Sequence, residues 1–389
     1  MDKSKWEYKK LGEVCANKKN IIRAHKFFSS SDEIIYIDIS SINNSSHKIE
    51  GFTKYIVSEA PSRAQQVVVK DDVLYSLVRP NLKNIAVVDL SNKNLVASSG
   101  FCILRGEQIV SKFLYYTLLS NRFTEYILRH IAGANYPATK IEDVMNYGSY
   151  IPSISEQRII VTELDQLNEL ISLKQQQLKE YDALAQSIFY EMFGNSQIEK
   201  KRIDYCVSEM HIGPFGSALK NDCFVDKDAS YCMVYEQQHA IKKTMSLPTR
   251  YVDKKKYEEL KRFTVIPGDI IMSCRGTIGE LYEIPQEAPM GIIHPSLMKI
   301  RIKRNIIDAS YFLFFMRDFI KEQQSNGATI KMAITAKALS KELIPLPPLT
   351  LQQSFAERVR AIERQKALVK QSIAEVQTLL DSRMQEYFG

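Results

Sequence analysis

The chain has 389 residues, 45% of them hydrophobic and 25% charged, which is typical of a folded soluble protein with two or three domains. It has no run of about 18 apolar residues, no apolar leader after its first residue and no Cys-x-x-Cys pair among its six cysteines. We therefore expect a cytoplasmic protein with reduced thiols and no membrane span. The formal net charge of +7 favours a polyanionic partner.

Residues 1–150 are expected to form a first globular module. The spacing of apolar residues within residues 111–129 predicts one helix near its end, and Trp6 is expected to anchor its core. Short β-like runs are separated by Gly, Pro, Asn and Ser, and they lie at residues 34–39, 67–69, 73–77, 85–88 and 101–104. This mixture predicts an α+β module with an irregular sheet.

Residues 151–194 begin with Ile151-Pro152 and then contain neither Gly nor Pro until Gly194. Apolar residues recur at alternating steps of four and three, with Lys174 as the one charged member, at positions 160, 164, 167, 171, 174, 178, 181, 185, 188 and 192. This heptad stripe predicts a coiled-coil helix of about 37 residues, roughly 55 Å long.

The second half of the chain repeats the first. Residues 195–343 form a second α+β module, with β-like runs at 231–235, 269–272 and 298–302 and a helix at 309–322. Residues 344–389 follow with Ile344-Pro345, and adding 195 to each stripe position gives a second heptad stripe that starts at Phe355 and ends at Tyr387, with Lys366 and Arg383 as its charges. The module interiors differ greatly in sequence. Repetition at this length indicates an internal duplication.

A narrow apolar stripe needs a partner to bury it, so we expect the two helices to pair with each other. A duplicated chain must return to begin its second half, which favours an antiparallel pair with the modules at opposite ends. The predicted fold is therefore two globular α+β modules separated by two long antiparallel coiled-coil helices, with approximate twofold symmetry. The alternative is that each stripe packs on its own module.

Positive charge is concentrated on the modules. Residues 1–150 hold 20 basic and 15 acidic side chains, and residues 195–343 hold 23 and 18, so each module carries +5. The helical segments hold 3 basic and 7 acidic, and 6 basic and 5 acidic, for a sum of −3. Basic modules favour contact with phosphates, although such an excess is also common on solvated surfaces.

The order of these parts resembles the specificity subunits of Type I restriction-modification enzymes. The resemblance spans nearly the whole chain and rests on the order of two modules and two helices. The residues that carry it are the two Ile-Pro openings, the glutamine-containing helix starts, and residues 72–83, 183–194, 213–220 and 276–279.

The resemblance implies that residues 1–150 and 195–343 are target-recognition domains, each reading one half of a bipartite and asymmetric DNA target. The helices would set the spacer and dock two methyltransferase subunits that methylate adenine, and a restriction subunit could join them. S-adenosylmethionine, ATP and Mg would belong to those partner subunits. This chain would hold no cofactor, no metal and no catalytic site.

Candidate DNA contacts lie in loops where a cation or polar side chain stands beside Gly or Pro. An ordinary turn is the alternative at each loop, helix capping is the alternative just before the two long helices, and a structural histidine is the alternative at position 294. The candidates are Arg79, Asn81, Lys83, Asn135, Tyr136, Lys140, Ser217, Lys220, Ser273, Arg275, Thr277, His294 and Lys331, with Thr139, Thr329 and Lys337 as further possibilities.

The candidate coiled-coil and partner interface comprises apolar stripe positions and helix-end aromatics. Its residues are Leu164, Leu167, Ile171, Leu178, Tyr190, Phe193, Val359, Ile362, Val369, Ile373, Val376 and Phe388. For the aromatics Tyr190, Phe193 and Phe388, the alternative is packing on the adjacent module.

Enzymatic alternatives find little support in the sequence. A methyltransferase needs an Asn/Asp-Pro-Pro-aromatic motif, and Pro347-Pro348 is flanked by leucines. Glu259-Leu260-Lys261 is a poor nuclease site, and Cys223, Cys232 and His239 lack the spacing of a zinc site. The remaining alternative is a coiled-coil scaffold with basic modules that bind nucleic acid or protein without sequence specificity.

Overall fold

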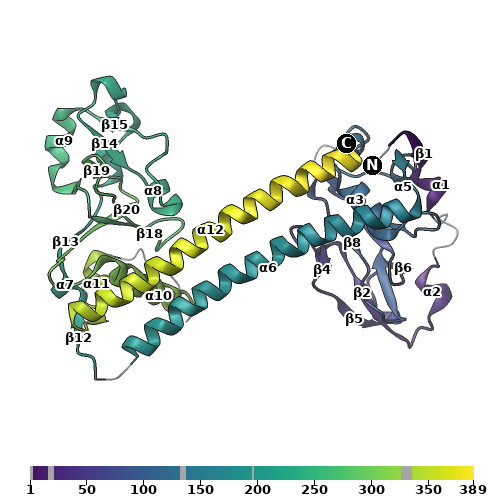
Figure 1. Cartoon of the computed structure of the whole chain (residues 1–389), viewed down its shortest axis with the longest axis horizontal. Coiled ribbons are helices and arrows are strands. Elements are labelled where there is room, and N and C mark those ends of the chain that lie inside the picture. Colours follow the sequence, from purple (N-terminus) through teal and green to yellow (C-terminus); the bar gives the residue numbers. More distant parts are fainter. Residues whose placement is uncertain (1–2, 16–21, 132–136, 195–196, 326–334) are drawn as a thin grey trace. The chain divides into compact units, whose positions relative to one another are not determined.

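The computed structural model describes residues 3–15, 22–131, 137–194, 197–325 and 335–389 (Figure 1). It divides into two compact units. Unit 1 comprises Met1–Gln177 and Val369–Gly389, and unit 2 comprises Leu178–Leu368. Each unit therefore contains one module together with one part of each long helix.

Unit 1 contains two principal sheets rather than one irregular sheet. Three strands form an antiparallel sheet in the order β10 (Phe101–Leu104), β7 (Val73–Ser76) and β8 (Ile85–Val87). Four strands form a mixed sheet in the order β5 (Thr53–Ile56), β2 (Glu33–Ile37), β9 (Leu95–Ser98) and β6 (Ala64–Val67), in which β2 and β9 are parallel. The predicted strand at 67–69 is thus displaced, since β6 ends at Val67.

Smaller elements complete unit 1. The strand β1 (Glu7–Lys10) pairs with β11 (Gly148–Ile151) and joins the two ends of the module, and β3 (Ile42–Asn43) pairs with β4 (Lys48–Ile49). Short helices are α1 (Leu11–Val14), α2 (Ala24–Phe27) and α5 (Ile141–Met145). Trp6 is buried in the core of this unit, as predicted.

The helix predicted at residues 111–129 is two helices, α3 (Ser111–Leu119) and α4 (Asn121–Leu128). Ser120 separates them because its side chain caps the second helix, where its hydroxyl accepts a hydrogen bond from the Phe123 N–H at 3.2 Å. A serine that bonds to the backbone in this way competes with continuation of the helix. The prediction of a single helix was therefore wrong.

Unit 2 repeats the strand orders of unit 1, with one additional strand at the edge of its antiparallel sheet. Its mixed sheet has the order β15 (Tyr251–Val252), β14 (Cys232–Tyr235), β19 (Gly291–Ile293) and β16 (Thr264–Val265), with β14 and β19 parallel. Its antiparallel sheet has the order β13 (Val207–Ile212), β20 (Leu297–Ile302), β17 (Ile270–Ser273) and β18 (Leu281–Glu283). The strand β12 (Lys200–Arg202) pairs with β21 (Leu343–Pro345), as β1 pairs with β11.

The helices of unit 2 are α7 (Ile203–Cys206), α8 (Gln237–Lys242), α9 (Lys254–Leu260), α10 (Ala309–Ser325) and α11 (Ala336–Leu339). The predicted helix at 309–322 corresponds to α10. Since the modules have the same strand order despite their different interiors, the duplication inferred from the chain ends extends through both modules.

A buried ion pair occurs at the same place in both units. In unit 1 the Asp72 carboxylate, fully buried, accepts two hydrogen bonds from Arg105, each 2.7 Å long. In unit 2 Asp269 accepts two hydrogen bonds from Arg301, 2.7 and 2.8 Å long. Each aspartate directly precedes the strand β7 or β17. Arg105 directly follows β10, and Arg301 is the next-to-last residue of β20. This pair therefore belongs to the common framework of the modules.

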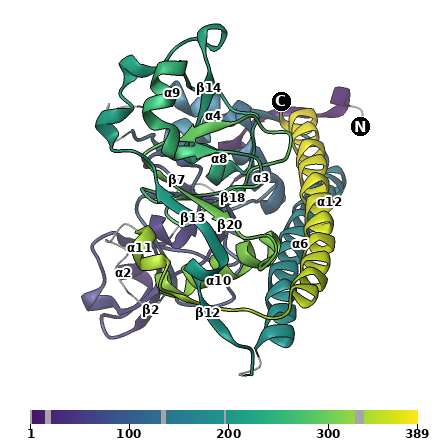
Figure 2. The same cartoon turned by 90° about the vertical axis from the view of Figure 1, so that its left-hand side faces the viewer.

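The two long helices are α6 (Ile154–Phe193) and α12 (Leu349–Phe388), each of 40 residues. Every predicted stripe position is buried or half-buried on both helices. In unit 1 the Arg383 and Tyr387 side chains bind Glu163, and in unit 2 the Lys366 ammonium binds Asp182 while the rings of Phe189 and Phe355 lie 5.5 Å apart. Within each unit the helices therefore run side by side and antiparallel (Figure 1, Figure 2).

One buried glutamine fixes the beginning of each long helix. The Gln157 amide oxygen accepts from the Val110 N–H at 2.7 Å, and its nitrogen donates to the Pro152 carbonyl at 2.9 Å. Gln352 makes the equivalent bonds to the Asp308 N–H at 2.9 Å and to the Pro347 carbonyl at 2.8 Å. Each glutamine ties its long helix to the start of the module helix α3 or α10.

None of the helices among the described residues is both long and apolar enough to cross a membrane.

Candidate nucleic-acid interface

Three candidate segments of unit 2 meet at the ends of its strands. They are residues 213–220 after β13, residues 274–280 between β17 and β18, and residues 294–296 between β19 and β20. The Gly213 N–H donates to the Leu297 carbonyl at 2.8 Å, and the Cys274 N–H donates to the Ser296 carbonyl at 2.8 Å. The pairing of β13 and β17 with β20 therefore brings residues that are distant in sequence to one edge of the module.

The Arg275 side chain is exposed on the loop between β17 and β18. Gly276 has a φ of +64°, a conformation that few other residues adopt without strain, so it lets the loop turn sharply. The Gln237 amide at the start of α8 donates to the carbonyls of Arg275 and Thr277. This support holds the backbone while the guanidinium and the exposed Thr277 side chain face solvent. An exposed guanidinium of this kind can bind a guanine edge or a phosphate.

His294 is half-buried beside this loop. Its ring Nδ1 lies 2.8 Å from the Ser296 hydroxyl, and its backbone N–H donates to the Tyr235 carbonyl at 2.9 Å. Burial, together with the positive charges of Arg250 and Arg275, lowers the pKa of His294. The ring is therefore held neutral near physiological pH, where it can donate or accept a hydrogen bond.

The segment from Gly213 to Lys220 presents side chains to solvent. A Cβ atom at Gly213 would lie 2.3 Å from the His294 carbonyl oxygen, so only glycine permits this close approach. Phe215 is 89% exposed, and Ser217 and Lys220 are exposed as well. An exposed ring beside a hydroxyl and a cation is suited to apolar and phosphate contacts with a duplex.

Unit 1 presents a corresponding loop between β7 and β8. Arg79 and Asn81 are both exposed on it, and Arg79 has a φ of +48°, similar to Gly276 in the loop of unit 2. The Leu77 N–H donates to the Gly100 carbonyl at 2.9 Å, just as Cys274 donates to Ser296. The two loops selected from the sequence as separate candidates therefore occupy equivalent places in the duplicated framework.

Several candidates have structural roles. Ser273 is fully buried and its hydroxyl accepts from the Glu280 N–H at 2.9 Å, so it shapes the turn and does not reach the surface. The Lys83 ammonium donates to the Leu119 carbonyl at 3.0 Å, at the end of α3. Thr139 is buried and bonds to Asp143 at 3.3 Å, which is the capping alternative, whereas the neighbouring Lys140 side chain is exposed. The prediction of Ser273 as a DNA contact is therefore corrected, since this serine has a structural role in the turn.

Other candidates near the long helices are placed in part. Lys337 is exposed on α11, where the Thr335 hydroxyl caps the helix by accepting from the Ala338 N–H at 3.1 Å. Asn135, Tyr136, Thr329 and Lys331 lie outside the described residues.

The predicted coiled-coil residues lie where the stripe requires. Those buried or half-buried along the helix pair are Leu164, Leu167, Ile171, Leu178, Val359, Ile362, Val369, Ile373 and Val376. The aromatics at the helix ends differ. Phe193 and Phe388 are each 4% exposed within the cores of unit 2 and unit 1, which is the module-packing alternative and leaves neither ring available for a partner. Tyr190 is exposed, and its hydroxyl donates to Asp318 at 3.1 Å.

Sequence reasoning did not single out Phe215, Gln237 or Arg250. Arg250 lies 4.2 Å from the Phe224 ring centre and donates to Glu236 at 2.6 Å, beside the edge that carries His294. A glutamine at the first residue of a short helix gives no distinctive signal, because its role depends on a loop some 40 residues away. Phe215 lies in the segment Gly213-Pro214-Phe215-Gly216, and an aromatic residue in such a turn sequence could have been selected as a candidate contact. Among the described residues, no group of three or more His, Cys, Asp or Glu side chains could hold a metal ion.

The geometry defines a class of protein with two related α+β modules, each packed against one part of each of two long helices. A model of the Type I restriction modification DNA specificity domain matches residues 3–181 and 235–378. These matches cover most of the chain, so the chain belongs to the family of Type I restriction-modification specificity subunits. The resemblance read from the sequence is thereby confirmed.

Individual relatives agree with this family. The specificity subunit of the Type I restriction enzyme HindI from Haemophilus influenzae is 25% identical over 194 residues, which cover 49% of this chain and 41% of that relative. The putative Type I restriction enzyme MjaX specificity subunit from Methanocaldococcus jannaschii is 22% identical over 386 residues, 92% of this chain and 87% of that relative. The present chain thus spans less than half of the first relative and most of the second.

A solved chain from work on the complex assembly and conformational transition of the Type I R-M system superposes with a TM-score of 0.67 at 23% identity, covering 98% of this chain and 97% of that one. The S subunit of a Type I restriction-modification system from M. genitalium superposes with a TM-score of 0.51 at 14% identity, covering 99% and 96%. At these identities the likeness establishes the fold.

Proposed function

We propose that each module reads one half of a bipartite, asymmetric DNA target. The observation that carries this proposal is that equivalent loops of the two modules present different side chains, Arg79 and Asn81 in unit 1 and Arg275 and Thr277 in unit 2. Arginine pairs with guanine and asparagine with adenine in the major groove. Two such sets on one framework would read two different half-sites.

We further propose that the long helices set the spacer between the half-sites and dock two methyltransferase subunits, which restriction subunits can join. The chain itself would position its partners and carry no catalysis, while S-adenosylmethionine, ATP and Mg would be bound by those partners in the cytoplasm. The net charge of +5 on each module would add affinity for phosphates that is independent of sequence.

The test is a map of N6-methyladenine across the genome by single-molecule sequencing, with the gene intact and with the gene deleted. We expect one bipartite motif to lose methylation on both strands upon deletion. Retention of every methylated motif, in cells where the partner methyltransferase is shown to be expressed, would contradict the proposal.

The spacer role has its own test. Inserting one heptad into each helix, after Gln177 and after Ser372, adds about 10.5 Å of helix. At about 3.4 Å per base-pair step, the spacer of the methylated motif should grow by about three base pairs while both half-sites stay the same. A changed half-site with an unchanged spacer would contradict the spacer role.

A further inference from the structure

Two consecutive residues at the start of α8 each hold an arginine of unit 2. Glu236 directly follows the strand β14, and its carboxylate binds the Arg250 guanidinium, through Nε at 2.6 Å and also through Nη2. Gln237 is the next residue, and its amide donates to the carbonyls of Arg275 and Thr277. The start of α8 therefore fixes both the Arg250 side chain and the loop that carries Arg275.

The Arg250 guanidinium is held in one orientation. Its Cζ atom lies 4.2 Å from the centre of the Phe224 ring. This ring packs in turn on buried side chains of unit 2, among them Leu219 and Val234. A guanidinium that is stacked on a supported ring and bound by a carboxylate has lost most of its rotational freedom before any ligand arrives.

The fork formed by Nη1 and Nη2 of Arg250 remains open to a ligand. Glu236 occupies the side of the guanidinium that carries Nε, so the fork points away from this carboxylate. Among the described residues, none forms a hydrogen bond with Nη1, and 38% of the Arg250 side chain is exposed.

Arg250 belongs to the same edge of the module as Arg275 and His294. Its carbonyl accepts from the Val234 N–H at 2.8 Å near the end of β14, and His294 directly follows β19, which runs parallel to β14. Burial lowers the pKa of His294, and the positive charges of Arg250 and Arg275 lower it further. Both guanidinium groups therefore lie near one histidine ring, although 25 residues separate them in the sequence.

We propose that Arg250 reads a guanine in the half-site of unit 2, in addition to the contact proposed for Arg275. This inference rests on the proposed function, which makes unit 2 a reader of DNA. The two N–H groups of a guanidinium fork match the O6 and N7 acceptors of guanine in the major groove. A fork held in one orientation discriminates between bases, whereas a phosphate contact requires only a cation. Glu236 is then a positioning residue for this contact.

Unit 1 has a threonine where unit 2 has Arg250. Arg250 lies opposite Val234, one residue before the end of β14. At the same position of β2, the residue opposite Tyr36 is Thr53. Threonine has no guanidinium, so the contact should be confined to the half-site of unit 2.

The test uses the full chain with its methyltransferase subunit, and duplexes that carry the motif methylated in the presence of the unmodified chain. Competition binding ranks the four bases at every position of both half-sites. We expect Arg250→Lys to lower the preference for guanine at one position of one half-site by roughly 5- to 150-fold. Affinity for duplexes without the motif should stay close to that of the unmodified chain, because lysine keeps the charge.

A second variant separates positioning from charge. Glu236→Gln keeps an acceptor at the start of α8 but weakens the hold on Arg250, so it should lower the same guanine preference by a smaller factor. Arg202→Lys is the matched control, because Arg202 also binds a carboxylate, that of Asp204, but lies on β12 before the start of β13. It should keep every base preference. Hydrogen exchange checks that unit 2 remains folded in each variant.

Unchanged base preferences in a folded Arg250→Lys chain would overturn this inference alone, as would an equal loss of affinity for every duplex or a lost preference for a base other than guanine. Full guanine preference in Glu236→Gln would overturn the positioning role. An unmodified chain that directs no bipartite motif would overturn the proposed function and this inference with it. The failures are therefore distinguishable.

Discussion

Apart from the additional edge strand β13 in unit 2, unit 1 and unit 2 have the same strand order and the same Asp–Arg pair, but they differ in the side chains of their surface loops. Two features belong to the common framework of the modules, since each recurs at an equivalent position. They are the ion pair, Asp72–Arg105 or Asp269–Arg301, and the buried glutamine, Gln157 or Gln352. The side chains of the equivalent surface loops differ between the units. Unit 1 has Arg79 and Asn81, and unit 2 has Arg275 and Thr277. The comparison separates residues that maintain the module from residues that give each module its own chemistry.

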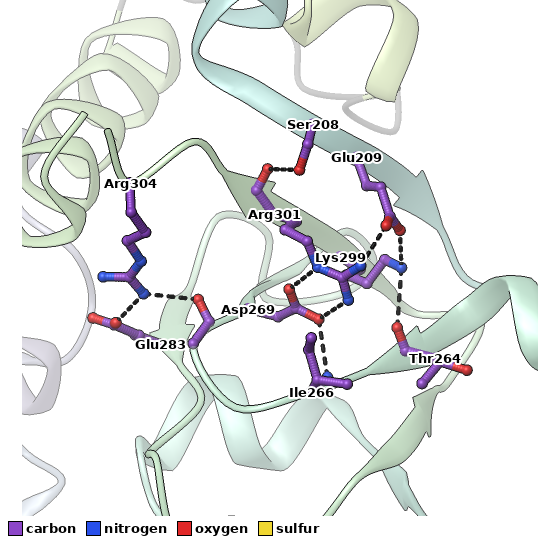
Figure 3. A network of polar contacts seen from close by, with 10 residues as sticks. Ser208, Glu209, Thr264, Ile266, Asp269, Glu283, Lys299, Arg301 and Arg304 are labelled. Carbon is purple, nitrogen blue, oxygen red and sulfur yellow. Dashed lines mark hydrogen bonds and ion pairs between the residues drawn. The ribbon is translucent and has the colours of Figure 1, made fainter. Parts of the chain in front are cut away.

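One framework position is itself different. Unit 2 has a buried lysine, Lys299, whose ammonium donates to Glu209 at 2.5 Å and to the Thr264 carbonyl at 3.0 Å, beside Arg301 (Figure 3). Two residues before the arginine of the framework pair, unit 1 has the buried apolar residue Ile103 instead. At this position unit 2 therefore has a lysine held by an ion-pair network, whereas unit 1 has a buried apolar side chain.

The largest effect is expected from Glu209→Ala. It would leave the Lys299 charge buried without its carboxylate, which should destabilise unit 2 by about 3 kcal/mol and leave unit 1 unchanged. Hydrogen exchange followed separately in peptides of each unit measures this. The double variant Glu209→Gln with Lys299→Ile, which copies the apolar solution of unit 1, should recover most of the loss. Equal destabilisation by the single and double variants would contradict the account of this network.

Next in size is the effect of Arg275→Ala on DNA recognition. Loss of a guanidinium that contacts a base should cost about 1 to 3 kcal/mol, roughly 5- to 150-fold in affinity, and relax only one half-site. Arg79→Ala is the matched variant and should relax the other half-site. Competition binding with duplexes altered in one half-site at a time measures both effects. If either variant weakens both halves equally, the two modules do not read separately.

A smaller effect is expected from Phe215→Ala. Because the ring is 89% exposed, its removal should not change the stability of unit 2, but it should weaken DNA binding by about 1 kcal/mol through loss of apolar contact with bases. Phe52→Ala, at a ring 50% exposed in unit 1, is the control for removing a surface aromatic. Binding titrations at one salt concentration compare the two variants. Identical affinities would show that Phe215 stands away from the duplex.

The smallest effect concerns pH. Burial lowers the pKa of His211, His239 and His294 in unit 2, and of His47 in unit 1. The unfolded histidine has a pKa of about 6.5, and the pKa of the folded one is lower. The stability that the neutral histidine contributes is therefore complete above about pH 6.5 and is lost as the pH falls from there toward the pKa of the folded state. Unit 2 should therefore lose more stability than unit 1 between pH 7.5 and 5.5. Urea unfolding followed by Trp6 fluorescence for unit 1 and by circular dichroism for the whole chain measures the difference, and a larger loss in unit 1 would reverse the comparison.

The duplication and the long helices could be predicted because heptad spacing and the paired Ile-Pro openings are local patterns. The break at Ser120 could not, since it depends on whether one serine side chain bonds to the backbone or to water. The division of each module into two sheets was also missed, because strand pairing such as β2 with β9 joins residues some 60 positions apart.

Only some of the candidate contacts could be predicted to be exposed, because exposure also depends on tertiary contacts. Arg79 and Arg275 are recognisable as cations in turn sequences, and both lie exposed at equivalent loops. Ser273 and Lys83 have the same residue types as the exposed candidates, but packing directs the serine into the interior and the lysine onto the end of α3. Burial of a polar side chain is decided by tertiary contacts that a local sequence does not reveal.

The central claim is that one framework holds two independent readers. The most direct test replaces residues 195–343 with a second copy of residues 1–150 and maps N6-methyladenine in cells that express this chain with its methyltransferase subunit. The account predicts a motif in which both half-sites are the one read by residues 1–150, with the spacer unchanged. A motif that retains the half-site assigned to residues 195–343 would contradict it.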